Sequence, residues 1–368
     1  MPSPGLDAVY GAPLDGVRVT DVPPDLAPLF AEAHRRIRCR PAGVHRGDGE
    51  IVDASGAPID RAREPDGWVP PDDGVVEALA AASAPIVLAG PGVVLDRAVP
   101  GLHALAAAGS LGVLNTWGAK GVFDWRSRHH LATVGLQALD FARGGLADAD
   151  LIVAVGVDER ETLADWRLAP VIEIPAGALS PLAERWGRPR VDIDMPPLRA
   201  DLARVTQAGW AVGGAPLLPT RVTRHYSAVL GGGGLVAADP GPAGYWVART
   251  LGTSGIGGAQ VPSDPGARGF AIACCIVARL VEPARPVLAV VDSIDEVHER
   301  LLKVAARLGV AVPVEVWRPD GDLLDADTHL RRLESLIAGD RCVSIATDPR
   351  QMEEMLAVAG PVVAWTRV

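Results

Sequence analysis

Short apolar runs, rich in β-branched residues, recur along the chain and alternate with segments whose apolar positions follow a helical period. The stretch "RPVLAVVDSIDEVHERL" shows this unit, because a continuous apolar run ends at Asp292 and acidic residues follow it. Such a run is typical of a strand buried on both faces of a parallel sheet. Beyond it, apolar residues recur at the spacing of a helix's buried stripe, at Ile294, Val297, Leu301, Val304 and Leu308.

Two series of these units are separated by a looser connecting region from about Pro196 to Pro219. In the first series we expect strands in "APIVLAGPGVV", "LGVLNTW", "LADADLIVAVG", "PVIEIP" and "RVDIDM", and a helix closed by Gly109 in "AVPGLHALAAAGS". In the second we expect strands in "GGGGLVAADPG", "PVLAVVDS", "VPVEVW", "CVSIAT" and "PVVAWTR", together with the nearly all-apolar helix "GARGFAIACCIVARLV".

Strands that alternate with helices predict an α/β fold with two doubly wound domains, mainly parallel sheets and helices on both faces. We assign residues 76–205 to a central Rossmann-like domain, 206–219 to a linker and 220–368 to a second domain. Residues 1–75 are rich in Pro, Gly and Asp, with one helical stretch, "APLFAEAHRRIRC", and no clear strand series. We expect this segment to pack onto the domains that come after it in the chain.

Composition limits the partners and the compartment. The 35 Lys and Arg against 45 Asp and Glu give a net charge of −10, which argues against nucleic-acid and anionic-membrane partners. No apolar stretch reaches the roughly 18 to 20 uncharged residues of a membrane span. The cysteines lack metal-binding spacing, and "MPSPGLDAVYGAPLDG" lacks the features of a secretory signal. We therefore expect a cytoplasmic protein with reduced thiols at Cys39, Cys274, Cys275 and Cys342.

Asp292 has two interpretations. In open α/β sheets, ligands bind at the carboxyl ends of strands, where loop amides and helix N-termini converge. A carboxylate there can hold a divalent cation, which in turn can hold a phosphate. Ser293 followed by Glu296, however, matches a capping box, in which Asp292 and Ser293 only satisfy the first amides of the next helix.

Two glycine-containing loops are candidate binding sites. Gly90 and Gly92 in "AGPGVVL" begin a dinucleotide fingerprint, but Leu95 stands where its third glycine is required, so a tight strand-to-helix turn is favoured. In "NTWGAKGVFDW", Lys120 suits a phosphate or a subunit contact, or is a solvated cation. The chain has no nucleophile elbow, zincin pair or P-loop, and we assign no catalytic residue.

The middle region resembles the central domain of thiamine diphosphate-dependent enzymes of the acetohydroxyacid synthase, pyruvate oxidase and benzoylformate decarboxylase type. The blocks "PIVLAGPGVV", "NTWGAKGVFDWRSRHHLATVG", "LADADLIVAVGVDER" and "VDIDM" occur in the family's order. The later region is similar to the family's pyrophosphate-binding domain in "LVAADPGPAGYWVART" and "GFAIACCIVARLVEPARPVLAVVDS". The resemblance covers roughly residues 80 to 365 and implies thiamine diphosphate and Mg²⁺ as cofactors.

The same resemblance implies a degenerate cofactor site. The family's strand ends in Gly-Asp-Gly; here Asp292 is kept, while Val291 and Ser293 replace the glycines. The family's Asn ligand falls near "WRPDG", where Asp320 could take its place on Mg²⁺. In "SDPGARGF", only Gly266 of the family's loop is clearly retained.

Upstream, "LAPLFAEAHRRIRCRPAGVH" resembles only the last helix and strand of the family's pyrimidine-binding domain, and no residue matches that domain's catalytic glutamate. Three hypotheses are compatible with this pattern. The chain is a non-catalytic binding or regulatory scaffold; or it is one subunit of a split 2-oxo acid lyase or synthase, whose partner supplies the pyrimidine-binding domain; or it binds an adenine nucleotide or acyl-CoA through the "AGPGVV" loop. The family also implies a homo-oligomer.

Overall fold

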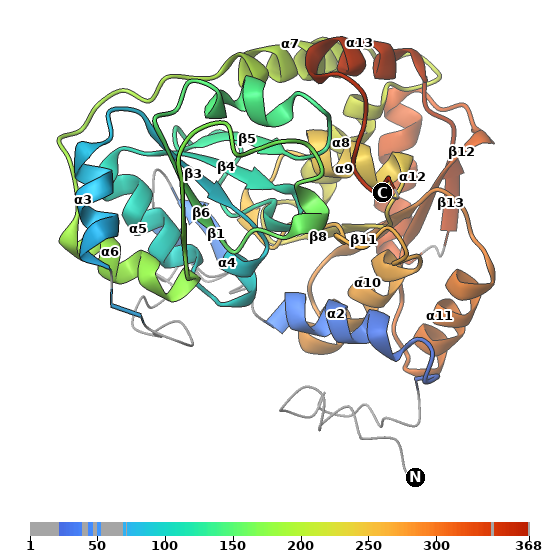
Figure 1. Cartoon of the computed structure of the whole chain (residues 1–368). Helices are drawn as coiled ribbons and strands as arrows, with labels where there is room; N and C mark the ends of the chain where they lie inside the picture. Colours follow the sequence, from blue (N-terminus) through green and yellow to red (C-terminus); the bar gives the residue numbers. More distant parts are fainter. Residues whose placement is uncertain are drawn as a thin grey trace.

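The computed structural model describes residues 22–38, 43–46, 50–52, 69–70, 72–339 and 342–366. Two five-stranded sheets lie beside one another, with helices on both faces of each (Figure 1). Every strand pairing within these two sheets is parallel. The predicted α/β fold with two domains is therefore confirmed.

The first sheet belongs to the central part of the chain. Its strands, in the order β5-β4-β3-β6-β7, are β3 (Pro85–Ala89), β4 (Gly112–Thr116), β5 (His130–Val134), β6 (Leu151–Val155) and β7 (Val171–Ile174). Alternate side chains enter different cores: Val87 packs with α5, and Leu88 with α7. The helices of this part are α3 (Asp73–Ala81), α4 (Gly92–Leu95), α5 (Val99–Gly109), α6 (Leu179–Arg185) and α7 (Pro197–Ala211). Short helical turns are η2 (Trp117–Ala119), η3 (Ala142–Leu146), η4 (Glu159–Glu161) and η5 (Ala176–Ala178).

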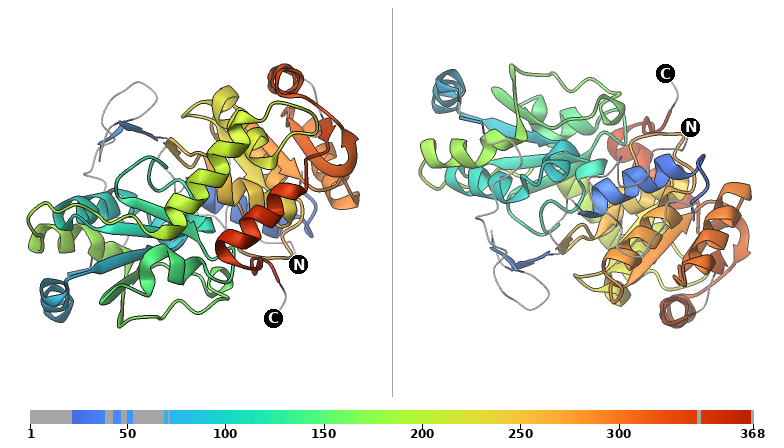
Figure 2. Two further views of the ribbon diagram at one scale, coloured as in Figure 1. Left: turned by 90° about the horizontal axis from the view of Figure 1, so that it is seen from above. Right: turned by 90° about the horizontal axis from the view of Figure 1, so that it is seen from below.

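The second sheet has the order β10-β8-β11-β12-β13. Its strands are β8 (Leu235–Ala238), β10 (Ala259–Gln260), β11 (Val287–Val291), β12 (Val314–Asp322) and β13 (Cys342–Ile345). One face packs against α2 (Ala27–Arg38), α10 (Phe270–Val281) and α11 (Glu296–Arg307). The other face packs against α8 (Pro219–Leu230), α9 (Pro242–Thr250), α12 (Ala326–Ala338) and α13 (Arg350–Ala359). Figure 2 shows this arrangement from above and below.

The described parts of the amino-terminal segment contact both domains: α2 packs onto the second domain, whereas the Val69 amide donates to Gly177 of the central domain. Phe30, Ala33 and Ile37 of α2 are buried in one core with α10, and Figure 1 shows the two helices side by side. Two short strands, β1 (Gly43–Arg46) and β2 (Glu50–Val52), join β9 (Gly255–Ile256) in an antiparallel sheet. The expected packing is confirmed for α2, and β1 lies where the resemblance implied a strand after this helix, whereas the sequence did not reveal β2.

Three expectations about local structure are wrong. Residues 190–195 form no strand; the side chains of Val191 and Met195 remain 44% exposed, so no buried face drives pairing. The connecting region from Pro196 to Pro219 is largely the helix α7, which contacts α8 and α13 of the second domain. In the carboxy-terminal stretch Val362 makes a single antiparallel bridge to Gln137, and the positive φ of 58° at Trp365 is incompatible with a strand.

Smaller differences concern helix ends and cysteines. Helix α5 includes Gly109, and the left-handed residue that ends it is Ser110, with a φ of 48°. Cys274 and Cys275 are buried free thiols in α10, and Cys342 is free and exposed. Cys39 lies outside the described residues. None of the described helices is long and apolar enough to cross a membrane.

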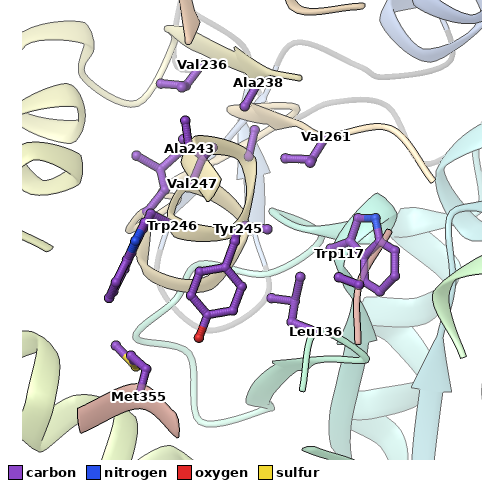
Figure 3. Packing of buried hydrophobic residues seen from close by; sticks show 14 of the residues in the cluster. Trp117, Leu136, Val236, Ala238, Ala243, Tyr245, Trp246, Val247, Val261 and Met355 are labelled. Atoms are coloured by element: carbon purple, nitrogen blue, oxygen red, sulfur yellow. The ribbon is translucent and has the colours of Figure 1, made fainter. Parts of the chain in front are cut away.

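A buried ion pair joins the two domains. The Arg249 guanidinium, near the end of α9, lies 2.7 Å from the Asp140 carboxylate of the central domain, and both side chains are 0% exposed. Asp140 also accepts the amides of Leu136 and Gln137, and the Gln137 side chain accepts from Arg249 and from the Tyr245 hydroxyl. Apolar residues of α9 complete the contact, as Tyr245 and its neighbours lie across from Leu136 and Trp117 (Figure 3).

This ion pair predicts a large effect on stability. Arg249→Met leaves the Asp140 charge buried without its partner, which typically costs about 3 to 5 kcal/mol. Urea denaturation should show that loss in the free energy of unfolding. The matched control is Arg318→Met, which breaks an exposed pair with Asp320 and should leave the free energy of unfolding nearly unchanged, because solvent screens such a pair. Equal effects for the two variants would contradict a structural role for the buried pair.

Candidate functional site

The second sheet has a topological switch point between β8 and β11. From β8 the chain reaches the edge strand β10, whereas β12 and β13 follow on the far side of β11. In doubly wound folds, ligands bind at the carboxyl ends of the two strands where this reversal occurs. Asp239 directly follows β8 and Asp292 directly follows β11, so this edge carries two carboxylates.

Asp292 caps a helix that precedes it in the chain. Its Oδ1 accepts the Ala243 amide at 2.9 Å, in the first turn of α9. Gly241, at a φ of 139°, lies so close that a Cβ there would collide with Asp292 Oδ2. Burial raises the pKa of Asp292 to about 6, although the Ala243 amide opposes this shift. A carboxylate thus occupies the position where a helix N-terminus binds anions.

Asp239 caps the N-terminus of α10 in the same way. Its two oxygens accept the amides of Gly269, at 2.6 Å, and Ala271, at 2.8 Å. Oδ2 also lies 2.8 Å from His298 Nε2. Burial lowers the pKa of His298, but the bonds to Asp239 and Asp295 outweigh burial and hold this pKa above its usual value. The His298 ring therefore lies between two of the chain's own acids, Asp239 and Asp295.

The third helix at this edge, α11, has a capping box different from the predicted one. Asp295 is its N-cap and accepts the amides of Val297 and His298, while the His298 ring accepts the Asp295 amide. The proposed box of Ser293 and Glu296 is wrong, because the helix begins later than the sequence suggested. Ser293 is exposed instead, and its hydroxyl accepts from Arg268 at 3.1 Å.

Two further cofactor candidates, Gly266 and Asp320, bind neighbouring residues of the chain itself. Gly266 is exposed, and its amide donates to Asp264 at 2.8 Å. The Asp320 side chain is 70% exposed and pairs with Arg318, which lowers its pKa. Within the described part of the chain, no group of three or more His, Cys, Asp or Glu side chains could hold a metal ion.

The residues at this edge do not fit magnesium diphosphate. A diphosphate would need the first-turn amides of α9 or α10, but Asp292 and Asp239 already accept from those amides. It would also face three carboxylates, since Asp295 caps α11 beside them. Like charges at such short range disfavour binding, and Arg268, which pairs with Asp295 at 2.7 Å, already offsets one of these carboxylates.

The switch point of the central sheet, between β3 and β6, is closed by glycines. The Gly90 amide donates to Val155 and the Gly92 amide to Gly156, both in or directly after β6. A Cβ at either glycine would collide with Gly156. These residues therefore allow two loops to touch, which supports the interpretation of a tight turn, and their amides are not free for a phosphate.

Lys120 lies apart from the edge that carries Asp239 and Asp292, which we call the carboxylate edge, in a cavity between β5, α7 and the end of α9.

Sequence reasoning missed Asp239 and His298, which complete the carboxylate edge. An acid directly after the apolar run in "LVAADPG" is the same signal that drew attention to Asp292, and it could have identified Asp239. Nothing in the local sequence indicates that His298 reaches back to Asp239.

The Asp292 cap predicts a pH dependence. The folded-state pKa of about 6 lies above the usual aspartate value of 3.8, so the carboxyl group contributes stability at low pH that is lost as pH rises through about 6. Asp292→Asn keeps an acceptor for the Ala243 amide without the charge. From about pH 4 to pH 7, the unfolding free energy of the unmodified chain should therefore fall relative to this variant in urea denaturation.

The companion variant Asp292→Ala removes the acceptor as well. It should be less stable than Asp292→Asn by about 0.5 to 2 kcal/mol at neutral pH, the usual cost of losing a helix cap. Parallel pH profiles for the unmodified chain and Asp292→Asn, together with equal stability of the two variants, would contradict the cap.

Comparison with known proteins supports the family resemblance over the central domain. Residues 73–174 match the family model described as thiamine pyrophosphate enzyme, central domain. No curated protein matches the chain. The matched segment runs from α3 to β7 and thus contains the whole central sheet. The resemblance to thiamine diphosphate enzymes is confirmed over these residues, and the central domain is similar to the central domain of that family.

Proposed function

We propose that this chain is a thiamine pyrophosphate enzyme-like scaffold that binds other molecules and is not catalytic on its own. The observation that carries the proposal is the pair of internal carboxylates at the switch point of the second sheet. Asp292 and Asp239 satisfy the helix amides that a diphosphate would use, and the described residues include no metal cluster. The scaffold keeps the two parallel sheets and replaces the cofactor's anion with its own.

The two alternative functions lack such support. A split 2-oxo acid lyase or synthase would need Asp292 and Asp320 on one metal ion, yet Asp292 binds α9 and Asp320 pairs with Arg318 at the surface. Binding of an adenine nucleotide or acyl-CoA through the Gly90 loop would need amides that already donate to β6 and the residue after it. Assembly into a homo-oligomer, or with a subunit that carries a pyrimidine-binding domain, stays a prediction.

Calorimetric titration with thiamine diphosphate and Mg²⁺ tests the proposal. The internal carboxylates should prevent binding, so we expect no metal-dependent heat at ligand concentrations of about 1 mM, the range of weak complexes. The purified chain should also fail to turn over pyruvate. Metal-dependent binding that Asp292→Ala abolishes, or turnover of any 2-oxo acid, would contradict the proposal.

A further inference from the structure

The cavity around Lys120 is independent of the carboxylate edge. It has a volume of about 300 Å³ and lies between β5, α7 and the residues after α9. Such a volume is at the lower end of the range for small-molecule sites. Among the described residues that line it, three are buried or half-buried cations and none is acidic: Lys120, Arg199 and Arg249.

The positive charge of this cavity is not balanced from within. Lys120 is only 5% exposed, and its ammonium forms no hydrogen bond or ion pair with any residue that the structure describes. Arg199 donates to the carbonyl oxygens of Ser127 and His130, which carry no net charge. Arg249 alone has a counter-ion, the Asp140 carboxylate. Burying unpaired cations is costly unless an anion joins them.

The neighbouring groups reinforce this imbalance. Burial and the nearby Arg249 charge lower the pKa of Lys120 to about 7. Burial, then the charges of Lys120 and Arg199, lower the pKa of His130 to about 3, so this imidazole stays neutral. In both shifts burial is the largest cause and neighbouring positive charge adds to it, so an additional positive charge in the cavity is disfavoured until a negative charge enters.

Two tryptophans and two donors without partners belong to the residues that line this cavity. Trp125 and Trp210 line the cavity, and their rings meet edge to face with centroids 5.8 Å apart. The indole N–H of Trp210 and Nε of Arg249 are buried without a hydrogen-bond partner among the described residues. A flat apolar surface beside unsatisfied donors is complementary to an aromatic acid.

We propose that this cavity binds a small aromatic anion, whose carboxylate or phosphate lies between Lys120 and Arg199 and whose ring packs against Trp125 and Trp210. The site joins the two domains, because Lys120 comes from the loop after β4, Arg199 and Trp210 come from α7, and Arg249 comes from α9. Binding adds the missing counter-charge and places acceptors beside the donors that lack them.

Calorimetry on the full chain with four probes tests this site. Benzoate and phenyl phosphate carry the ring with each type of anionic head; benzamide keeps the ring without the charge, and inorganic phosphate keeps the charge without the ring. We expect at least one of the first two to bind, and to bind at least tenfold more tightly than both benzamide and inorganic phosphate. The relative affinities of benzoate and phenyl phosphate then tell which head the site prefers.

Lys120 and Lys303 are the two lysines of the sequence, which provides a matched control. Lys120→Met should weaken binding of the aromatic anion by roughly 10- to 100-fold, the usual value of a charge-assisted hydrogen bond. Lys303→Met, at an exposed position of α11, should leave the affinity unchanged. Trp210→Leu should weaken the binding of the aromatic anion but should not change the binding of inorganic phosphate.

The charge state of Lys120 gives a second, independent measurement on the unmodified chain. With lysine labelled by ¹³C at Cε, the two side chains give two NMR signals, and Lys303→Met assigns them. The Lys120 signal should titrate near pH 7, and the bound anion should raise that midpoint. The other ionisable groups near the cavity should not change charge around pH 7: His130 stays neutral, Asp124 and Asp140 are paired with arginines, and the arginines keep their charges, namely Arg126, Arg199 and Arg249. Lys120 should therefore dominate the pH dependence of binding.

The binding and NMR measurements can each support or overturn the proposed anion site. Binding that depends on Lys120 and weakens by up to tenfold per pH unit above about 7 supports the site. Absence of binding by both aromatic anions, or equal affinities of Lys120→Met and Lys303→Met, would overturn it. A Lys120 signal that is unchanged by saturating benzoate and phenyl phosphate would overturn it even if a variant failed to fold.

Discussion

The arrangement of the two domains depends on the buried ion pair between Arg249 and Asp140. A fully buried charge requires a partner of opposite charge, and Arg249 and Asp140 are such partners for one another. Because Arg249 lies in the last turn of α9 and Asp140 belongs to the loop after β5, the pair fixes one end of α9 against the central domain. The other end of the same helix is capped by Asp292 from β11. Helix α9 therefore contacts the central domain at one end and the switch point of the second sheet at the other end.

The electrostatics of helix N-termini explain why a scaffold of this kind can lose a cofactor and keep its fold. Amides in the first turn of a helix need acceptors, and a bound phosphate or an internal carboxylate satisfies them equally in principle. Here Asp292 accepts one amide in the first turn of α9, and Asp239 and Asp295 each accept two amides at the start of α10 and α11. The fold at this edge consequently requires no ligand. Among the residues that the structure describes, buried positive charge without a counter-ion is found in the cavity of Lys120.

Strand and helix positions could be predicted from the sequence wherever burial is continuous. The apolar runs of β3, β6, β8 and β11 and the stripe of α11 required no tertiary information. The errors arose where contacts distant in sequence decide. Val362 forms a bridge to Gln137 in place of the expected strand, and α7 has a weak apolar stripe that becomes buried through packing against both the central sheet and the second domain. The candidate site was likewise predictable in position but not in bonding. The apolar run placed Asp292 at a ligand-binding edge, yet the Ala243 amide that it binds lies 49 residues earlier in the chain. The sequence drew attention to Lys120 because of its glycine-containing loop. The positive charge around Lys120, however, comes from Arg199 and Arg249, which only the tertiary fold brings into the same cavity.

The proposed replacement of the diphosphate by internal carboxylates at the second switch point can be tested directly by amide NMR of Ala243, Gly269 and Ala271. We predict that these three resonances do not move when thiamine diphosphate and Mg²⁺ are added. We also predict that the Ala243 resonance shifts with pH around a midpoint of about 6, the pKa of the Asp292 carboxyl group that accepts its amide. Saturable, metal-dependent shifts of these amides on addition of the cofactor would contradict the replacement.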